Sequence, residues 1–97
     1  MAQVVYSTRA LDHIERSFRF LRDKNPDAAT SAVTAIQSAV DNLAAHPLVG
    51  RRIEGDLREL IISYGHSGYV ALYRFVISID EVRILAIRHQ REVGFLP

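Results

Sequence analysis

The amino-acid sequence predicts an α+β fold with the element order β-α-α-β-β-β, in which a helical hairpin packs on one face of a small antiparallel sheet. Three observations lead to this prediction. Residues 8–46 carry apolar residues at helical spacing, in two segments separated by Asn25-Pro26. From Leu57 onward, apolar residues form extended runs separated by turn residues. A short apolar run, Gln3–Tyr6, adds a strand at the N-terminus.

The first helix is predicted to begin at Ser7 or Thr8, either of which can cap it, and to stop near Lys24-Asn25 before Pro26. Its side chains repeat at spacings of three, four and three, which places them on one face of a helix. This apolar stripe consists of Leu11, Ile14, Phe18 and Leu21.

The second helix is predicted to restart directly, with Asn25 as the cap and Pro26 in the first turn. It is expected to end at His46-Pro47. Its apolar stripe consists of Val33, Ile36, Val40 and Leu43. Because the connection between the helices is so short, they should lie antiparallel as a hairpin.

Three further strands are predicted over residues 57–64, 69–77 and 82–89. Alternation along the middle strand sends Val70, Leu72, Arg74 and Val76 to one face, and Tyr69, Ala71, Tyr73 and Phe75 to the other. Both faces are largely apolar, and a helical hairpin covers only one of them. The apolar surface left over predicts a protein partner.

Length and composition indicate one domain, residues 1–97, that can bury a core without disulfides. There is no cysteine, and the four histidines are scattered, so neither a metal site nor a cofactor is expected. The net charge of +1 does not favour strong nonspecific binding to nucleic acid. The N-terminal residues resemble neither a signal peptide nor a membrane helix, so a cytoplasmic location is expected.

The last predicted strand ends in a dense polar cluster, Arg88-His89-Gln90-Arg91-Glu92. On a regular strand, His89 would share a face with Arg83, while Arg88 would point to the other face. Guanidinium groups gathered beside an imidazole suit an anion, such as a phosphate or a row of carboxylates. The candidates for binding such a target are Arg51, Arg52, Arg58, Arg74, Arg88, His89 and Arg91.

Two interpretations of this cluster remain open at the level of the residues. A ribonuclease needs a proton-transfer group and cations that stabilise the phosphate, and the candidates for these roles are Glu54, Arg58, Arg74, His89 and Arg91. In the structural interpretation, His89 caps a strand end and the arginines form ion pairs with nearby acids. The pairs would join Arg58, Arg74 and Arg88 to Glu59, Asp56 and Glu92. The residue pattern alone favours this second interpretation.

Four stretches of the sequence together resemble the RelE/ParE family of toxin–antitoxin toxins, over nearly the whole chain. They are LAAHPLVGR at 43–51, LREL at 57–60, YVALYR at 69–74 and VRILAIRH at 82–89. The resemblance implies a RelE/ParE-like fold and a small toxin neutralised by a cognate antitoxin, which would also be its only link to operator DNA. Disordered antitoxin segments fold on such toxins. The candidate antitoxin contacts are Leu11, Ile14, Phe18, Val70, Leu72 and Val76.

The resemblance leaves three functions open. ParE-type members poison DNA gyrase, and RelE-type members cut messenger RNA in the ribosome. The nucleases commonly carry an arginine directly after the aromatic residue that corresponds to Tyr69, where this chain has Val70. The strand ending Ile87-Arg88-His89 also looks more like the ParE pattern, so gyrase is the preferred target. The alternatives are a ribosome-dependent mRNA endonuclease and a non-toxic co-repressor that only binds the antitoxin.

Overall fold

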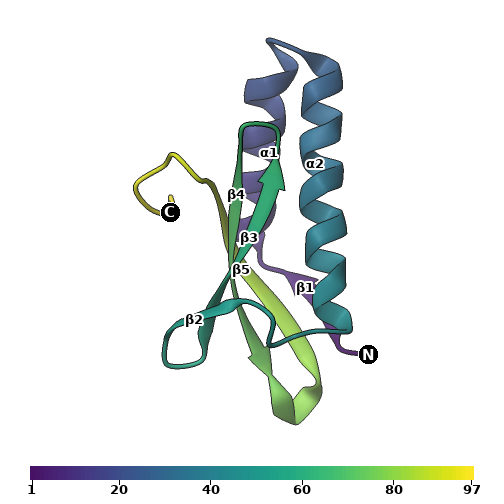
Figure 1. Ribbon diagram of the computed structural model, residues 1–97, viewed down its shortest axis with the longest axis vertical. Coiled ribbons are helices and arrows are strands. Elements are labelled where there is room, and N and C mark those ends of the chain that lie inside the picture. The colour runs from purple at the N-terminus through teal and green to yellow at the C-terminus, as the bar shows by residue number, and fades with distance from the viewer.

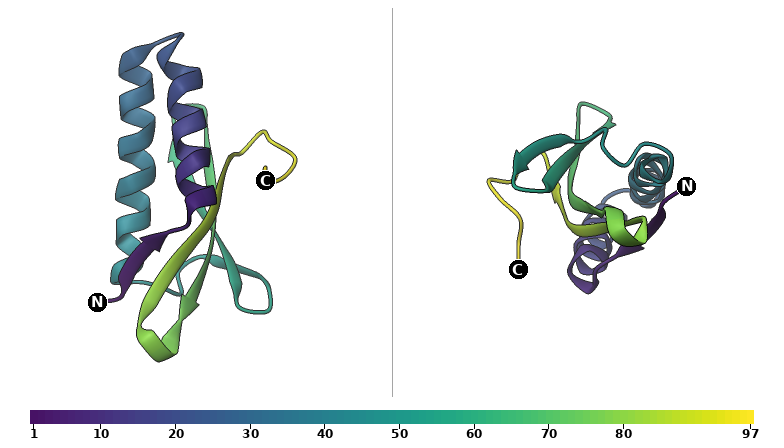
Figure 2. Two further views of the ribbon diagram at one scale, coloured as in Figure 1. Left: turned by 180° about the vertical axis from the view of Figure 1, so that it is seen from behind. Right: turned by 90° about the horizontal axis from the view of Figure 1, so that it is seen from below.

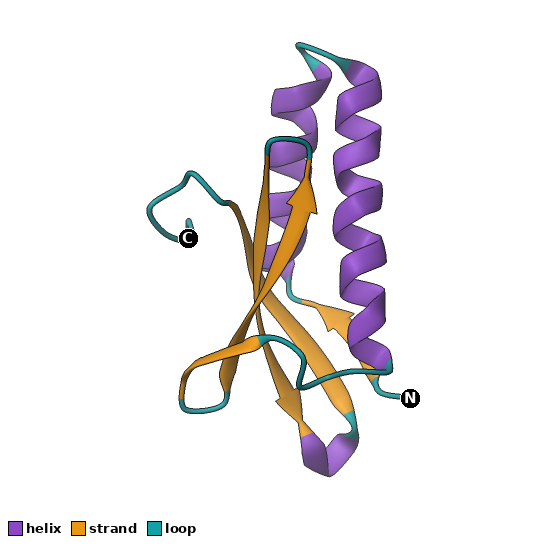
Figure 3. Ribbon diagram, in the orientation of Figure 1, coloured by secondary structure: helices purple, strands orange, loops and turns teal.

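The computed structural model describes residues 1–97 and contains two helices and five strands (Figures 1 and 3). In chain order they are β1 (Gln3–Tyr6), α1 (Thr8–Arg22), α2 (Pro26–Asp41), β2 (Arg51–Glu54), β3 (Leu57–Tyr64), β4 (Ser67–Val76) and β5 (Glu81–His89). Short 3-10 helices follow α2 at Asn42–Ala44 and β4 at Ile77–Ile79.

The strands form one sheet in the order β1-β5-β4-β3-β2. All neighbouring pairs are antiparallel except β1 and β5, which run parallel. Helix α1 packs against β5 and α2 against β3, so the helical hairpin covers one face of the sheet (Figure 2). The predicted α+β fold, with its helical hairpin on a small sheet, is therefore confirmed.

The structure adds one strand to the prediction. Residues 51–54, for which the sequence predicts no strand, form the edge strand β2, which pairs with β3 through Arg51–Glu59 and Arg52–Arg58. This strand has only four residues, all of them exposed, and its register shifts between Arg52 and Glu54. Since β2 has no buried side, its sequence lacks the alternation by which strands are found.

Both predicted helix caps are present. The Ser7 hydroxyl accepts a hydrogen bond from the Ala10 amide at 3.0 Å, and the Asn25 side chain accepts one from the Ala28 amide at 3.2 Å. Each cap satisfies an amide that lacks a partner within the helix. The second helix ends at Asp41 rather than near His46, because a 3-10 turn takes over at Asn42.

The core lies between the helical hairpin and the sheet. Its largest fully buried side chains are Tyr73, Ile36, Leu43, Ile84, Val40 and Val82. The predicted stripe of α1 is rotated, because Leu11 is 53% exposed whereas Ala10 and His13 are buried. His13 points inward, and its ring accepts a hydrogen bond from the Ile87 amide at the edge of β5.

A bulge in β5 changes the predicted faces of that strand. Tyr73 lies opposite Ile84, and Leu72 lies opposite Ala86, so Leu85 is an extra residue without a partner. Such an insertion reverses the alternation beyond it. The expectation that His89 shares a face with Arg83 is therefore wrong.

Candidate functional site

The face of the sheet that the helices leave uncovered carries apolar residues bordered by ion pairs. Ile61 is 54% exposed, and Leu72 and Val76 are half-buried. The ion pairs are Arg51–Glu59 at 2.7 Å, Arg74–Asp56 at 3.3 Å and Arg83–Glu81 at 2.6 Å. We call this surface the open face. Its arginines are thus largely neutralised by carboxylates of the chain, including the predicted pair of Arg74 and Asp56.

Arg74 stands out within the open face. It lies directly opposite Arg83 on β5, so two guanidinium groups occupy neighbouring positions across the strands. Like charges placed opposite each other on a sheet are destabilising. The Arg74 Nε atom is buried and has no hydrogen-bond partner, although its Nη2 atom contacts Asp56. Arg74 is therefore the least satisfied arginine of this surface.

Arg58 lies on the opposite, helix-covered face and holds a loop. Its Nη1 atom donates hydrogen bonds to the carbonyls of Leu48 and Gly50, at 3.0 and 2.9 Å. The Tyr73 hydroxyl donates to the Pro47 carbonyl at 2.9 Å and accepts from the Gly50 amide at 2.8 Å. We call this arrangement of Arg58 and Tyr73 on residues 47–50 the loop clamp.

Burial is the main cause that raises the pKa of Tyr73 above its ordinary value. The hydrogen bond from Gly50 and the charge of Arg58 act in the opposite direction but are weaker. The phenol therefore stays neutral and keeps both hydrogen bonds of the loop clamp through neutral pH.

The polar end of β5 also holds backbone. The Arg88 Nη1 atom donates to the carbonyls of His89, Gln90 and Glu92, at 3.0–3.3 Å, and its guanidinium lies over the Phe95 ring. His13 joins the β5 edge to the C-terminus. Its Nδ1 accepts from the Ile87 amide at 3.0 Å, and its Nε2 lies 2.8 Å from the Leu96 carbonyl. We call the arrangement of His13, Arg88 and His89 around residues 89–97 the tail clamp.

The contacts of His89 determine its tautomer. The Arg91 amide, which can only donate, points at Nδ1 from 3.1 Å, so Nδ1 is the acceptor. In the neutral ring the proton then lies on Nε2, which donates to the Ser67 hydroxyl at 3.0 Å. Both ring nitrogens are occupied, and no lone pair is free to take a proton from a substrate.

The structure does not bring the five nuclease candidates to one point. Arg58 lies opposite Tyr73 and His89 opposite Tyr69, which places them four residues apart along β4, or about 13 Å. Arg74 is on the other face of the sheet. Glu54 lies on the edge strand, and Arg91 in the C-terminal turn.

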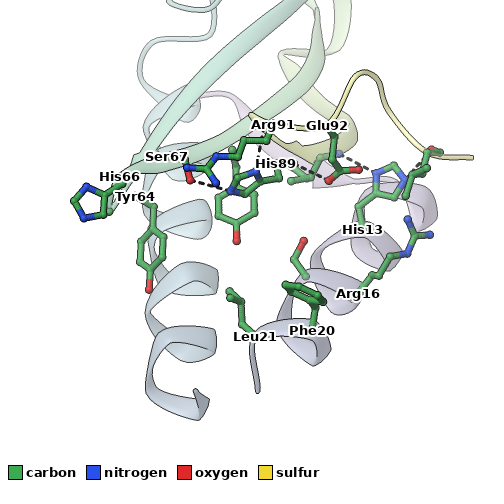
Figure 4. Close-up of a pocket in the computed structure, with 15 residues that line it drawn as sticks. His13, Arg16, Phe20, Leu21, Tyr64, His66, Ser67, His89, Arg91 and Glu92 are labelled. Carbon is green, nitrogen blue, oxygen red and sulfur yellow. Dashed lines mark hydrogen bonds between the residues drawn. The ribbon is translucent and has the colours of Figure 1, made fainter. Parts of the chain in front are cut away.

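The largest hollow, about 680 Å³, lies between α1, the turn joining β3 to β4, and the C-terminal turn (Figure 4). Its apolar lining includes Phe20, Leu21, Tyr64, Tyr69 and Ile87; its polar lining includes His13, Arg16, Ser17, His66, Ser67, His89, Arg91 and Glu92. Burial, with smaller contributions from Tyr64 and Glu92, raises the pKa of Tyr69 on its wall.

The sequence indicated only two members of this hollow, His89 and Arg91. Arg16 and Phe20 lie outside the apolar stripe of α1 and follow no recognisable motif. The exposed fraction of Phe20, 63%, is unusual for an aromatic side chain on a helix that packs against a core. An aromatic residue outside the apolar stripe is the one signal in the sequence that could have identified the α1 wall of the hollow.

The candidate antitoxin contacts fall on two surfaces. Leu11 is exposed on α1, with Ile14 and Phe18 half-buried beside it. Leu72 and Val76 lie on the open face, whereas Val70 is only 2% exposed. Val70 lies opposite Arg88, and the Arg88 guanidinium contacts the Phe95 ring. The tail therefore shields this end of the open face.

No group of three or more His, Asp or Glu side chains is arranged to hold a metal ion. Neither helix combines the length and the apolar character that crossing a membrane requires.

Comparison with known proteins identifies relatives of the chain. The family described as ParE toxin of type II toxin-antitoxin system, parDE, matches residues 4–94. Toxin RelE3 of Caulobacter vibrioides is 38% identical over 92 residues, which cover 95% of this chain and 98% of that protein.

Solved structures share the fold at lower identity. A chain of the chromosomal ParDE TA system from P. aeruginosa superposes with a TM-score of 0.76 and 22% identity, covering 92% of this chain and 96% of that one. A chain of the E. coli RelBE toxin-antitoxin complex gives a TM-score of 0.64 and 13% identity, covering 95% and 100%.

Proposed function

Because the chain belongs to the ParE toxin family of type II toxin–antitoxin systems, we propose that it is a growth-inhibiting toxin that acts on DNA gyrase and is neutralised by a cognate antitoxin. Family membership carries the toxin–antitoxin part of the proposal. The names of the relatives do not indicate the target, since the matching family is called ParE and the curated relative RelE.

One observation supports gyrase over the messenger-cutting activity: the groups that a ribonuclease needs are separated and occupied. His89 has both ring nitrogens in hydrogen bonds, and Arg58 is bound to two backbone carbonyls. General base catalysis needs a free lone pair within hydrogen-bond reach of the substrate. A toxin that works by binding a protein needs no such group.

Two assays with the purified protein separate the targets. We expect inhibition of DNA supercoiling by gyrase, and no cleavage of messenger RNA on translating ribosomes. The His89→Ala variant should likewise leave messenger RNA on the ribosomes uncleaved, since His89 is assigned no catalytic role. Ribosome-dependent cleavage that His89→Ala abolishes, together with normal supercoiling, would replace the gyrase assignment by the nuclease.

Expression without an antitoxin tests toxicity itself. We expect growth arrest in bacteria that produce the chain alone, and normal growth when a cognate antitoxin is co-produced. Normal growth with folded protein present would instead favour a non-toxic copy that only binds its antitoxin.

We further propose that the antitoxin covers the open face. Solved relatives of this fold include toxin–antitoxin complexes. Ile61, Leu72 and Val76 offer apolar contacts there, and the ion pairs around them form a polar rim. Operator DNA would then be reached through the antitoxin, which agrees with a net charge of only +1.

A matched pair of substitutions tests this surface. Ile61→Ser should weaken antitoxin binding about tenfold or more, the effect of removing one buried apolar anchor. Ile77→Ser is the control, because Ile77 is 75% exposed in the turn between β4 and β5, outside the open face. Equal binding by both variants would place the antitoxin elsewhere.

A further inference from the structure

Two arginines differ from all the others in having no partner. Of the eleven arginines, nine have a side-chain hydrogen bond or an ion pair within the chain. Arg16 and Arg91 have neither, and both line the same 680 Å³ hollow, although 75 residues separate them in the sequence (91 minus 16). Figure 4 shows Arg16 on the α1 wall and Arg91 on the wall that carries His89.

A hydroxyl group on the Arg91 wall is prepared to donate. The Arg91 amide donates to His89 Nδ1, so His89 Nε2 carries the ring proton and donates to the Ser67 oxygen. Ser67 is therefore an acceptor toward His89, and its own hydrogen is free. Donors linked in such a chain polarise one another. Ser67 and the guanidinium of Arg91 together provide two donor groups for one anion.

The rest of the lining offers a surface against which an aromatic or apolar group can pack. Phe20 is 63% exposed, and Tyr64 and Tyr69 stand with their ring centroids 6.5 Å apart and their planes at 45°. The volume lies within the range of roughly 300–1,000 Å³ that small-molecule sites occupy. The only carboxylate in the lining, that of Glu92, already accepts from the His89 amide. The charge that remains uncompensated is positive.

From these observations we infer that the hollow binds a planar aromatic compound bearing a phosphate, the chemistry of a nucleoside monophosphate. The phosphate bonds to the Arg91 guanidinium and the Ser67 hydroxyl, and the ring packs against Phe20 and the tyrosines. Arg16 contributes positive charge from the opposite wall. Neither the gyrase assignment nor the antitoxin surface requires this site, which lies at the helix-covered side of the sheet rather than on the open face.

The test is titration of the full-length protein with AMP, GMP, adenosine and inorganic phosphate, followed by NMR amide shifts and calorimetry. We expect both nucleotides to bind and to shift the amides of Ser67, Tyr69 and Arg91, and adenosine and phosphate to bind more weakly. Arg91→Gln and Ser67→Ala should each weaken AMP binding, the arginine variant by about tenfold or more, the effect of losing a charged hydrogen bond.

Arg22→Gln is the matched control, since Arg22 is an exposed arginine at the end of α1 whose ion pair is with the adjacent Asp23. It should bind AMP like the unaltered protein. The inference is overturned if millimolar nucleotide produces no binding, if Arg91→Gln and Arg22→Gln bind alike, or if phosphate alone binds as tightly as AMP. Supercoiling and growth assays are separate measurements, so failure of this site leaves the proposed function untouched.

Discussion

The loop clamp and the tail clamp use the same chemistry at opposite ends of the sheet but are embedded differently. In the loop clamp, the phenol that binds the loop belongs to Tyr73, which is fully buried in the core. In the tail clamp, most of the residues that are held, 90–97, are exposed. Hydrogen bonds of the same kind should therefore matter for the stability of the fold in the loop clamp, and mainly for the order of the tail in the tail clamp.

The largest effect is expected from crowding the loop clamp. A Cβ atom at Gly50 would lie 2.5 Å from the Tyr73 hydroxyl and 2.9 Å from the Glu59 carbonyl. Gly50→Ala should lower the free energy of unfolding by about 2–3 kcal/mol, as overpacking does. Urea denaturation measures this. Gly94→Ala, which meets nothing within 4 Å in the tail, should change it by less than about 0.5 kcal/mol. Similar losses for the two variants would mean that the ends do not differ.

Removing only the Tyr73 hydroxyl should have the next largest effect. Tyr73→Phe leaves the Gly50 amide without its partner and should cost about 1–3 kcal/mol. The control is Tyr64→Phe, because the hydroxyl of the half-buried Tyr64 donates only to the Ala28 carbonyl. That variant should cost about 0.5–1 kcal/mol. A smaller loss for Tyr73→Phe than for Tyr64→Phe would contradict the assignment of Tyr73 to the loop clamp.

Breaking the tail clamp should separate global stability from local order. His13→Leu removes the acceptor of the Ile87 amide and the contact to the Leu96 carbonyl, at a cost of about 1 kcal/mol in unfolding. Hydrogen exchange at the Ile87 amide should accelerate by more than the reduced free energy of unfolding predicts. The reason is that this amide loses its acceptor and residues 90–97 lose their contact with His13. Exchange that stays slow at Ile87 would contradict the assignment of His13 as the acceptor of this amide.

The smallest effect is expected from alkaline pH. Burial is the largest cause that raises the pKa values of Tyr6, Tyr69 and Tyr73 above the ordinary value of 10.0. Below that value these tyrosines are neutral in both states, so their contribution is fully present. As pH rises further, these tyrosines ionise first in the unfolded chain. The free energy of unfolding therefore falls until the pH exceeds their pKa values in the folded protein. The melting temperature should stay constant from pH 8 to 9.5 and decline above pH 10. The decline should be smaller in the Tyr73→Phe variant, which lacks one of the three phenols.

The fold could be predicted because its signals are local and repetitive. Ser7 and Asn25 cap their helices as expected, and the alternation in β4 correctly placed Tyr69, Ala71 and Tyr73 on one face, which the structure shows to be the core face. Edge strand β2 was missed because no side of it is buried. The bulge at Leu85 was missed because an unpaired residue in an apolar run leaves no pattern in the sequence.

The functional residues were harder to predict, since residue type does not reveal what a side chain bonds to. The sequence placed Arg58, Arg88 and His89 at strand ends, where a target could bind them. The structure shows that the two arginines donate to backbone carbonyls of the chain itself, and that His89 bonds to the Arg91 amide and the Ser67 hydroxyl. The arginines that remain without partners, Arg16 and Arg91, come from segments that only the tertiary fold brings together.

The parallel pairing of β1 with β5 has a consequence for how the chain reaches its native state. Strand β1 pairs with no strand other than β5, so the first of the five strands to be made must wait for the fifth. Contacts between such distant segments form slowly, because a large loop has to close first. A nascent chain shortened anywhere before β5 would lack the strand that joins its two halves. Translation would therefore have to pass β5 before a functional molecule could exist.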